Sequence, residues 1–502
     1  MAVVPVPSEP PVNAHLAAEG LECALSDLGG DLGELSFLCR VAEERLAGLE
    51  AVLTDACPHP ATRDLLGRTV ASARRRYRVL SGRLGALLGE AQYAPRSRSL
   101  VERVAAERAS LADRLRVEQA LLAGLVAAPD WQSPSFLHSL APAAGRQAGL
   151  IRAHWNDYKR DRHVDAEEYE RCYVEEMIDG PPGPRALLTG CGMAAFTTIL
   201  GWLLGEGKAS GRVLAGRGLY HESRLLLERM LPGRVCFADE ADTATLLRTI
   251  GECRPSVVFL DSLSNTPWMP MPDLGAVIDA LRGTDTYLVL DNTCLSVGCQ
   301  PFALACESVR LVVFESLLKY AQLGLDRVAA GVIVARSRDA ESLENYREHL
   351  GTNIPDLSVH ALPPPDRAVL ERRLARLERN ALHLARGLDE SAPPEVSVVY
   401  PERGGCVSVL FEEGEERLER QHRVVCEAVA EASRRGIRLL AGSSFGFDTT
   451  RIYLTAARAQ HGTPFVRIAA GIDHRLELDA LTDVLATAIE TSASPPFTLT
   501  AR

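Results

Sequence analysis

Two polar residues follow short apolar runs of the chain and could do chemistry there. Asp291 follows residues 287–290, and Lys319 comes shortly after residues 311–314. Runs this short do not make stable helices, and they are typical of strands buried on both faces of a parallel sheet. The carboxylate and the amine are therefore expected at the carboxyl ends of two strands, where open α/β sheets bind their ligands.

A carboxylate and an amine at one edge of a sheet meet two requirements of pyridoxal phosphate. This cofactor forms a Schiff base with a lysine and needs an anion that keeps its ring nitrogen protonated. Taken alone, Asp291 has the simpler explanation of a helix cap, and Lys319 that of a solvated side chain. The residues at the other strand ends support the interpretation of this pair as a cofactor site.

The segment Gly190-Cys-Gly-Met-Ala-Ala195 follows another short apolar run and begins an apolar helix. Small residues at such a turn let backbone N–H groups and the helix dipole face a phosphate, although the signal is weak by itself. By default, Tyr220 is an aromatic at the sheet edge and Asn265 is a turn former. The informative feature is the order of these residues at successive strand ends, completed by a late arginine, Arg467.

Alternating strands and helices must position these residues. Short apolar runs predict strands at 185–188, 211–215, 234–237, 256–260, 287–290, 311–314 and 330–334. Most are separated by segments of helix length, which indicates a mostly parallel sheet covered by helices on both faces. This large domain is expected to span residues 158–360.

A smaller α+β domain is expected over residues 361–502, after a proline-rich break. The pattern predicts, in order, a helix at 367–388, strands at 396–400 and 406–411, a helix at 422–435, a strand at 467–470 and a helix from 477. Ahead of the large domain, residues 1–12 are expected to be a disordered tail and residues 129–157 a linker.

Residues 13–128 have apolar side chains with helical periodicity, interrupted at 57–60 and near Pro95. The pattern predicts an N-terminal bundle of antiparallel helices. None of its side chains looks catalytic, so it is expected to serve packing or oligomerisation, or alternatively to dock a carrier or partner. Its deletion is then expected to leave cofactor binding intact.

Composition excludes several classes of protein. The 502-residue chain has a net charge of -11, which argues against a nucleic-acid partner and against an anionic membrane surface. No apolar run is long enough to span a membrane, and the N-terminus lacks the features of a signal peptide, so a cytoplasmic location is expected. The twelve cysteines show no zinc-binding spacing, and no metal site is expected.

From about Trp155 onward, the motifs together resemble the cystathionine gamma-synthase and gamma-lyase family. These are pyridoxal-phosphate enzymes of sulfur amino-acid metabolism with the aspartate-aminotransferase fold, fold type I. The resemblance implies an α/β fold with a mostly parallel central sheet and a smaller C-terminal α+β domain, here with an added N-terminal helical bundle. It also implies pyridoxal 5'-phosphate as cofactor and a small-molecule amino acid as substrate.

The resemblance assigns cofactor contacts, in chain order, to Tyr158, Arg160, Gly192, Met193, Tyr220, Asn265, Asp291, Ser316 and Lys319. It implies that Lys319 forms the Schiff base, that Asp291 holds the ring nitrogen, and that Tyr220 stacks on the ring and assists departure of the leaving group. These three are the implied catalytic residues. Asn265 would approach the phenolic oxygen of the cofactor.

The phosphate and the substrate also have implied partners. Gly192 and Met193 would supply backbone amides to the phosphate, together with the hydroxyl of Ser316. Arg467 would hold the substrate α-carboxylate, and Ser443 would lie on the substrate side. The segment Tyr158-Lys-Arg160 resembles the family's Tyr-x-Arg, which reaches the cofactor phosphate of a neighbouring subunit, so a homodimer or homotetramer with shared sites is expected.

The chain departs from the family pattern on the substrate side. Leu318 replaces a threonine before the lysine, and Gly324-Leu-Asp-Arg-Val328 replaces the loop that follows. A specialised relative is therefore expected. The implied reaction is γ-substitution or γ-elimination, with C–S or C–C bond formation, through a vinylglycine-type quinonoid intermediate. The alternatives are a β-eliminating lyase, an aminotransferase, and a scaffold of this fold without turnover.

Overall fold

The computed structural model describes residues 12–56, 59–128, 164–412, 414, 417–455 and 463–492. The predicted tail therefore lies outside the described residues, apart from Val12, with which the first helix begins. The predicted linker, Tyr158 and Arg160 also lie outside them.

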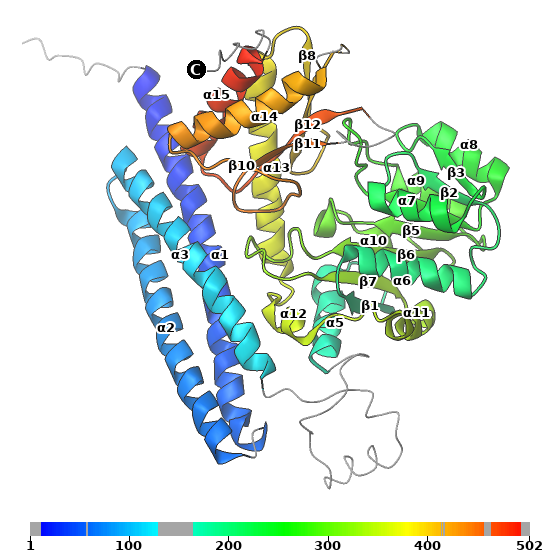
Figure 1. The fold of residues 1–502 in the computed structure, drawn as a ribbon, viewed down its shortest axis with the longest axis horizontal. Coiled ribbons are helices and arrows are strands. Elements are labelled where there is room, and N and C mark those ends of the chain that lie inside the picture. Colours follow the sequence, from blue (N-terminus) through cyan, green and yellow to red (C-terminus); the bar gives the residue numbers. More distant parts are fainter. Residues whose placement is uncertain are drawn as a thin grey trace, which may run out of the picture.

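Three long helices form the N-terminal part of the fold and lie side by side in Figure 1. They are α1 (Val12–Ala56), α2 (Pro60–Tyr93) and α3 (Arg98–Ala127). A new helix begins after each predicted break. Pro60 occupies the first turn of α2, where its missing N–H costs nothing. Ser97 caps α3 by accepting a 3.1 Å hydrogen bond from the backbone of Leu100. The predicted helical region is confirmed.

A seven-stranded sheet forms the centre of the molecule, with strand order β1-β7-β6-β5-β4-β2-β3. Its strands are β1 (Pro184–Thr189), β2 (Val213–Gly216), β3 (Val235–Ala238), β4 (Val257–Asp261), β5 (Tyr287–Asp291), β6 (Arg310–Ser316) and β7 (Gly331–Arg336). β7 runs antiparallel to both of its neighbours, and the other paired strands are parallel. The mostly parallel sheet was predicted.

Helices cover both faces of this sheet (Figure 1). They are α5 (Val164–Met177), α6 (Gly192–Gly205), α7 (His221–Met230), α8 (Thr243–Cys253), α9 (Leu274–Leu281), α10 (Pro301–Leu304), α11 (Ser337–Leu350) and α12 (Asp356–Ala361), with a 3-10 turn η2 (Ser296–Gly298). Phe259 of β4 packs on Phe196 of α6, with ring centroids 5.8 Å apart, while its neighbour Val258 joins the core of the opposite face. Because the strands are buried on both faces of the sheet, their sequences are continuous apolar runs.

The C-terminal part contains a second sheet, with order β10-β11-β12-β9-β8. Its elements are α13 (Arg367–Ser391), β8 (Val396–Val399), β9 (Cys406–Phe411), α14 (Arg417–Arg434), β10 (Leu440–Ala441), β11 (Arg451–Thr455), β12 (Phe465–Ala469) and α15 (Arg475–Thr491). The sequence analysis missed β10 and β11. β10 has only two residues, both exposed, and the five-residue β11 pairs in parallel with β10 and antiparallel with β12.

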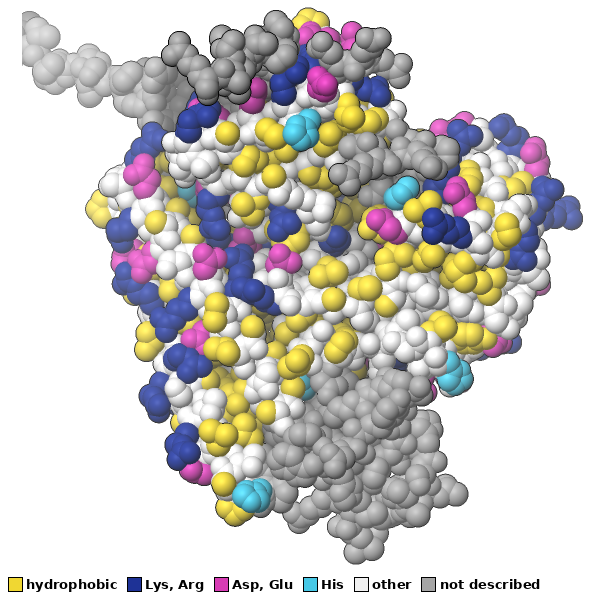
Figure 2. All heavy atoms as spheres, viewed as in Figure 1, with side chains coloured by type: hydrophobic (Ala, Val, Ile, Leu, Met, Phe, Trp, Pro, Cys, Tyr) yellow, Lys and Arg dark blue, Asp and Glu magenta, His cyan; other side chains and the backbone are white. Residues whose placement is uncertain are grey.

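The N-terminal helices pack against the rest of the chain and are not a separate body. α1 contacts α15, α3 contacts α12, and one apolar core runs from the three helices into the large sheet. On the outer face of the helices, basic and acidic side chains are interspersed (Figure 2). No helix in the described ranges is long and apolar enough to cross a membrane.

Candidate active site

Several of the predicted residues meet where β4, β5 and β6 end. In the strand register, Asp261 of β4 lies beside Asp291 of β5, which lies beside Phe314 of β6. Lys319 follows three residues after β6 ends at Ser316, and its ammonium group interacts electrostatically with Asp291. The parallel sheet thus brings the predicted acid and amine to one edge.

Asp291 and Asp261 form a buried pair of carboxyl groups with different surroundings. Burial raises the pKa of both, and repulsion by Asp291 raises the pKa of Asp261 further. Asp291 is favoured as the ionised member, because it accepts a 2.9 Å hydrogen bond from the backbone of Thr293 and faces Lys319. The structure therefore places a buried carboxyl group near Lys319, at the strand end where the sequence predicted an acid.

Asp261 positions two other predicted residues. Its Oδ2 accepts hydrogen bonds from the backbone N–H of Tyr220 at 2.9 Å and from the side-chain amide of Asn265 at 3.0 Å. Tyr220 immediately precedes α7 and is 39% exposed, so its ring lies at the entrance of the site. Burial, followed by the charge of Glu222, raises the pKa of the Tyr220 hydroxyl, which therefore stays protonated.

Lys319 lies between the two sheets, against a segment of the C-terminal part. Its Nζ is 2.5 Å from the hydroxyl of Ser444 and 5.2 Å from the ring centroid of Phe445. Burial lowers the pKa of Lys319, which favours the neutral amine that a nucleophile or base requires. Ser444 has a left-handed backbone, with φ of 80°, a strained conformation for a residue other than glycine.

Ser443, the residue predicted on the substrate side, is exposed. Its carbonyl oxygen accepts a 3.0 Å hydrogen bond from the side chain of Arg451. The neighbouring Ser444 is the serine that contacts Lys319, because the left-handed turn at this position directs its side chain inward. The substrate contact predicted for Ser443 stays a prediction, and the contact to Lys319 is made by the adjacent Ser444.

The predicted phosphate site lies where α6 begins. Cys191 caps the helix by accepting a 3.3 Å hydrogen bond from the backbone of Ala194, and Gly192 is the first helical residue. A Cβ atom on Gly192 would lie 2.7 Å from the Cβ of Ser316, so only glycine allows this approach. Gly192, Met193 and Ser316 therefore surround a helix N-terminus, the part of a helix that binds anions.

Arg467 is buried on β12 opposite Tyr453 of β11. Its guanidinium donates to the Tyr453 hydroxyl at 3.4 Å and to the carbonyl of Asn265 at 3.5 Å, while its Nε has no hydrogen-bond partner. Within the described ranges, no carboxylate pairs with it. Arg467 also lines a small cavity together with Asn265, Cys294, Tyr320, Cys406 and Phe445.

Several residues of the site were not predicted. These are Asp261, Cys294, Cys406, Ser444 and Tyr453. Burial raises the pKa of both cysteine thiols, so they stay protonated within electrostatic range of Lys319 and Arg467. Asp261 follows the apolar run 256–260 as Asp291 follows the run 287–290, and it could have been singled out for this reason, whereas no sequence signal marks Cys406 or Tyr453.

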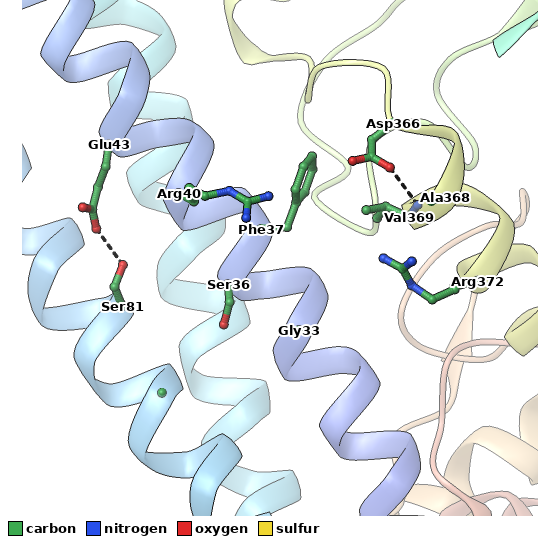
Figure 3. Close-up of a pocket in the computed structure, with 11 residues that line it drawn as sticks. Gly33, Ser36, Phe37, Arg40, Glu43, Ser81, Asp366, Ala368, Val369 and Arg372 are labelled. Atoms are coloured by element: carbon green, nitrogen blue, oxygen red, sulfur yellow. Dashed lines mark hydrogen bonds between the residues drawn. The ribbon is translucent and has the colours of Figure 1, made fainter. Parts of the chain in front are cut away.

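An open groove between α1, α2 and the start of α13 lies apart from this site (Figure 3). Asp366 in its wall caps α13 through a 2.9 Å hydrogen bond from the backbone of Val369, and Glu43 accepts a 2.7 Å bond from Ser81. None of the predicted site residues lines it. Over the described parts of the chain, no cluster of three or more His, Cys, Asp or Glu could hold a metal ion.

The arrangement around Lys319 fits pyridoxal phosphate. A buried carboxyl group and a lysine of lowered pKa share one edge of the sheet, and the N-terminus of α6, where only glycine fits at position 192, lies nearby. Asp261 and Arg467 each keep a buried polar atom without a hydrogen-bond partner, Oδ1 and Nε respectively. These are the groups that a planar, anionic cofactor and a carboxylate substrate would engage.

Comparisons with known proteins also indicate a pyridoxal-phosphate enzyme. Residues 122–406, more than half of the chain, match the family described as Cys/Met metabolism PLP-dependent enzyme. The bifunctional enzyme flvA of Aspergillus flavus is 27% identical over 333 residues, which are 63% of this chain and 40% of that protein. An O-succinylhomoserine sulfhydrylase of Mycobacterium tuberculosis is 32% identical over 119 residues, 23% of this chain and 28% of that enzyme. The chain thus spans less than half of either relative.

Solved structures of two cystathionine gamma-synthase-type proteins share the fold. The metB structure from Corynebacterium glutamicum superposes with a TM-score of 0.56 at 21% identity, covering 67% of this chain and 88% of that one. Cystathionine gamma synthase from Xanthomonas oryzae pv. oryzae, in complex with cystathionine, gives a TM-score of 0.54 at 22% identity, covering 68% and 90%.

Proposed function

Because the chain belongs to the Cys/Met metabolism family of PLP-dependent enzymes, we propose that it binds pyridoxal phosphate through Lys319 and carries out γ-substitution or γ-elimination on an amino acid. The observation that carries the substrate class is Arg467, a guanidinium that is 7% exposed and has no carboxylate partner in the described ranges. A buried cation of this kind is suited to a bidentate pair with an amino-acid carboxylate.

Each side chain has a proposed task. The N-terminus of α6, with Gly192, Met193 and Ser316, would hold the cofactor phosphate, and Tyr220 would cover the ring. Asp291 would hold the proton on the ring nitrogen. When bound, the cofactor supplies an electron sink for the bonds at the substrate Cα.

Lys319 is proposed as both the attachment point and the base. Its lowered pKa leaves a fraction of neutral amine, which can take the proton from the substrate Cα and return it at a neighbouring carbon. Ser444 would orient this amine through its hydrogen bond, and Tyr220 would assist the leaving group at the entrance. Arg467 would fix the substrate carboxylate at the other end, and Asn265 would approach the phenolic oxygen of the cofactor.

The relatives favour γ-chemistry over the alternatives. One is named for an O-succinylhomoserine substrate, and one structure contains cystathionine; both compounds carry a leaving or entering group at the γ-carbon. For this chain we propose an activated homoserine, a methionine-like or a cystathionine-like amino acid. Sulfur or carbon would be the nucleophile, in a specialised biosynthetic reaction.

Incubation with candidate substrates in heavy water tests the reaction class. Purified protein with pyridoxal phosphate would be offered O-acylhomoserines, S-adenosylmethionine and cystathionine, and recovered amino acids analysed by mass spectrometry. γ-Chemistry places deuterium at both Cα and Cβ, because protons leave both carbons. Exchange confined to Cα would instead support β-elimination where pyruvate is formed, and transamination where the keto acid formed retains the γ-substituent. The control, Lys319→Ala, is expected to lose the visible absorption of bound cofactor and all exchange.

We also propose that the active unit is at least a homodimer, in which Tyr158 and Arg160 reach the phosphate of the neighbouring subunit. The support is the family motif, since both residues lie outside the described ranges. Mixing inactive Lys319→Ala with inactive Arg160→Ala is expected to restore activity, because a hybrid dimer has one intact site. Absence of recovery despite demonstrated subunit exchange would exclude a shared site.

A further inference from the structure

Three arginines converge on one buried carboxylate where the N-terminal helices meet the C-terminal part. Asp448, whose side chain is 7% exposed, accepts hydrogen bonds from Arg108 at 3.1 Å and Arg116 at 3.2 Å, both on α3, and from Arg373 on α13 at 2.8 Å. Burial alone would raise the pKa of Asp448, but the three guanidinium groups hold its pKa well below the usual range. Asp448 is therefore a fixed anion.

Asp448 belongs to the segment 442–450, which touches Lys319 at two points. Ser444 contacts the Lys319 amine at 2.5 Å. Gly446 packs on the backbone of the same residue, since a Cβ atom there would lie 2.8 Å from the carbonyl carbon of Lys319. Holding Asp448 in place thus restrains the segment that orients the lysine.

A second segment beside Lys319 is held by Arg116, one of the two α3 arginines that bind Asp448. Arg116 donates to the carbonyl oxygen of Gly324 from Nε at 3.1 Å and from Nη2 at 3.0 Å. Gly324 lies in the turn after Lys319, in a left-handed conformation, and a Cβ atom there would come within 1.8 Å of an Asp448 oxygen. One guanidinium therefore joins segments 320–328 and 442–450.

We propose that Arg116 is a positioning residue for Lys319, through which the N-terminal helices form a structural part of the active site. Arg116 reaches no reacting atom itself. It acts by joining the two segments between which the lysine lies, so that the Ser444 contact is retained. The proposal rests on the functional role proposed for Lys319.

Substitution of Arg116 tests this positioning role without an expected loss of the fold. Asp448 would still be paired with Arg108 and Arg373, so no buried charge is left without a partner and the fold is expected to persist. Arg116 would lose its bridge to Gly324, its hydrogen bond to Asp448 and its pair with the exposed Asp113. Of these contacts, the bridge to Gly324 is the one that ties segment 320–328 to α3. Arg114, exposed two residues earlier on α3, provides a matched control on the same helix.

Hydrogen exchange and lysine labelling of the full-length chain test the proposal. In the cofactor-loaded protein, Arg116→Ala is expected to speed amide exchange about tenfold in both segments, 320–328 and 442–450, with other regions unchanged. In the cofactor-free chain, the pH midpoint for acetylation of Lys319 is expected to rise toward that of an exposed lysine, about 10.4. Arg114→Ala is expected to change neither measurement.

Unchanged exchange in either segment, or an unchanged labelling midpoint, in a folded Arg116→Ala protein would overturn the proposal. If that variant does not fold, Arg116→Met, which keeps the apolar stem, is judged by the same two measurements. Failure of both variants to fold would also overturn it, because Arg108 and Arg373 would then not suffice for Asp448. Neither measurement depends on turnover, so an error in the proposed reaction, shown by the heavy-water experiment, remains distinguishable.

Discussion

At the scale of single residues, the carboxyl pair at the sheet edge makes a specific prediction. Asp291→Asn is expected to keep bound cofactor but lower turnover about 10²-fold or more, because an amide cannot hold the ring nitrogen in its charged form. Absorption spectra and kcat of the purified variant provide the measurement. Asp261→Asn is the comparison, since Asp261 is favoured as the neutral member. Near-normal turnover of Asp291→Asn would assign the role to another group.

A second residue-scale prediction concerns Glu315, which is buried on β6 and accepts hydrogen bonds from Ser296 at 2.7 Å and Tyr173 at 3.0 Å. Burial raises its pKa from 4.5 to about 7, although both hydrogen bonds lower it. Its folded-state pKa exceeds the unfolded value, so its contribution to stability is complete below pH 4.5 and is lost as pH rises through about 7. The shift amounts to roughly 3 kcal/mol.

Glu315→Gln removes this titration and is expected to reduce the fall in Tm between pH 5 and pH 8. Thermal unfolding of the unmodified protein and of Glu315→Gln at the two pH values provides the measurement. Glu176→Gln, at an exposed position of α5, is the control and is expected to follow the unmodified protein. If Glu315→Gln shows the same fall as the unmodified protein, Glu315 does not titrate in this range.

At the scale of elements, the start of α6 carries the proposed phosphate site. Gly192→Ala would place a Cβ atom 2.7 Å from the Cβ of Ser316, so the helix N-terminus must move away from β6. Affinity for pyridoxal phosphate is expected to fall at least about tenfold, measured by fluorescence titration, with kcat of the saturated enzyme less affected. Gly251→Ala, on α8 with open space around it, is expected to leave affinity unchanged. Equal affinities would place the phosphate elsewhere.

At the scale of the whole molecule, the ion pairs at Asp448 change the expectation for the N-terminal helices. The sequence pattern predicted that their deletion leaves cofactor binding intact, but α1 and α3 supply buried partners to α13 and to segment 442–450. Deleting residues 1–128 leaves Arg373 without Glu34 and exposes the shared apolar core. Breaking one buried pair by removing a partner costs about 3–5 kcal/mol.

We therefore expect the truncated chain to aggregate or to bind a hydrophobic dye, and to bind pyridoxal phosphate weakly. Size-exclusion chromatography, dye fluorescence and the absorption spectrum of the truncated chain provide the measurements. A monodisperse truncated chain with cofactor affinity equal to that of the full chain would restore the original expectation. It would also show that the helices only pack against the site.

The sequence by itself determined the fold class and brought the candidate acid and lysine to one edge of the sheet. Asp291, Lys319, Ser316 and Gly192 could be placed because each belongs to a local pattern, an apolar run or a glycine turn that ends in polar residues. In a parallel sheet such strand ends meet at one edge whatever the connecting helices contain. Local periodicity also predicted the three N-terminal helices, since each buries a continuous apolar stripe.

Only the tertiary structure decided which side chains surround the lysine. Ser444 contacts Lys319 across 125 positions of the chain, and Arg108 pairs with Asp448 across 340. Such contacts leave no periodic trace, because a polar residue on a helix face or in a turn looks the same whether it meets solvent or a buried partner. The contact between Ser444 and Lys319 depended on one left-handed turn, and the contact between α3 and Asp448 depended on how the helices pack.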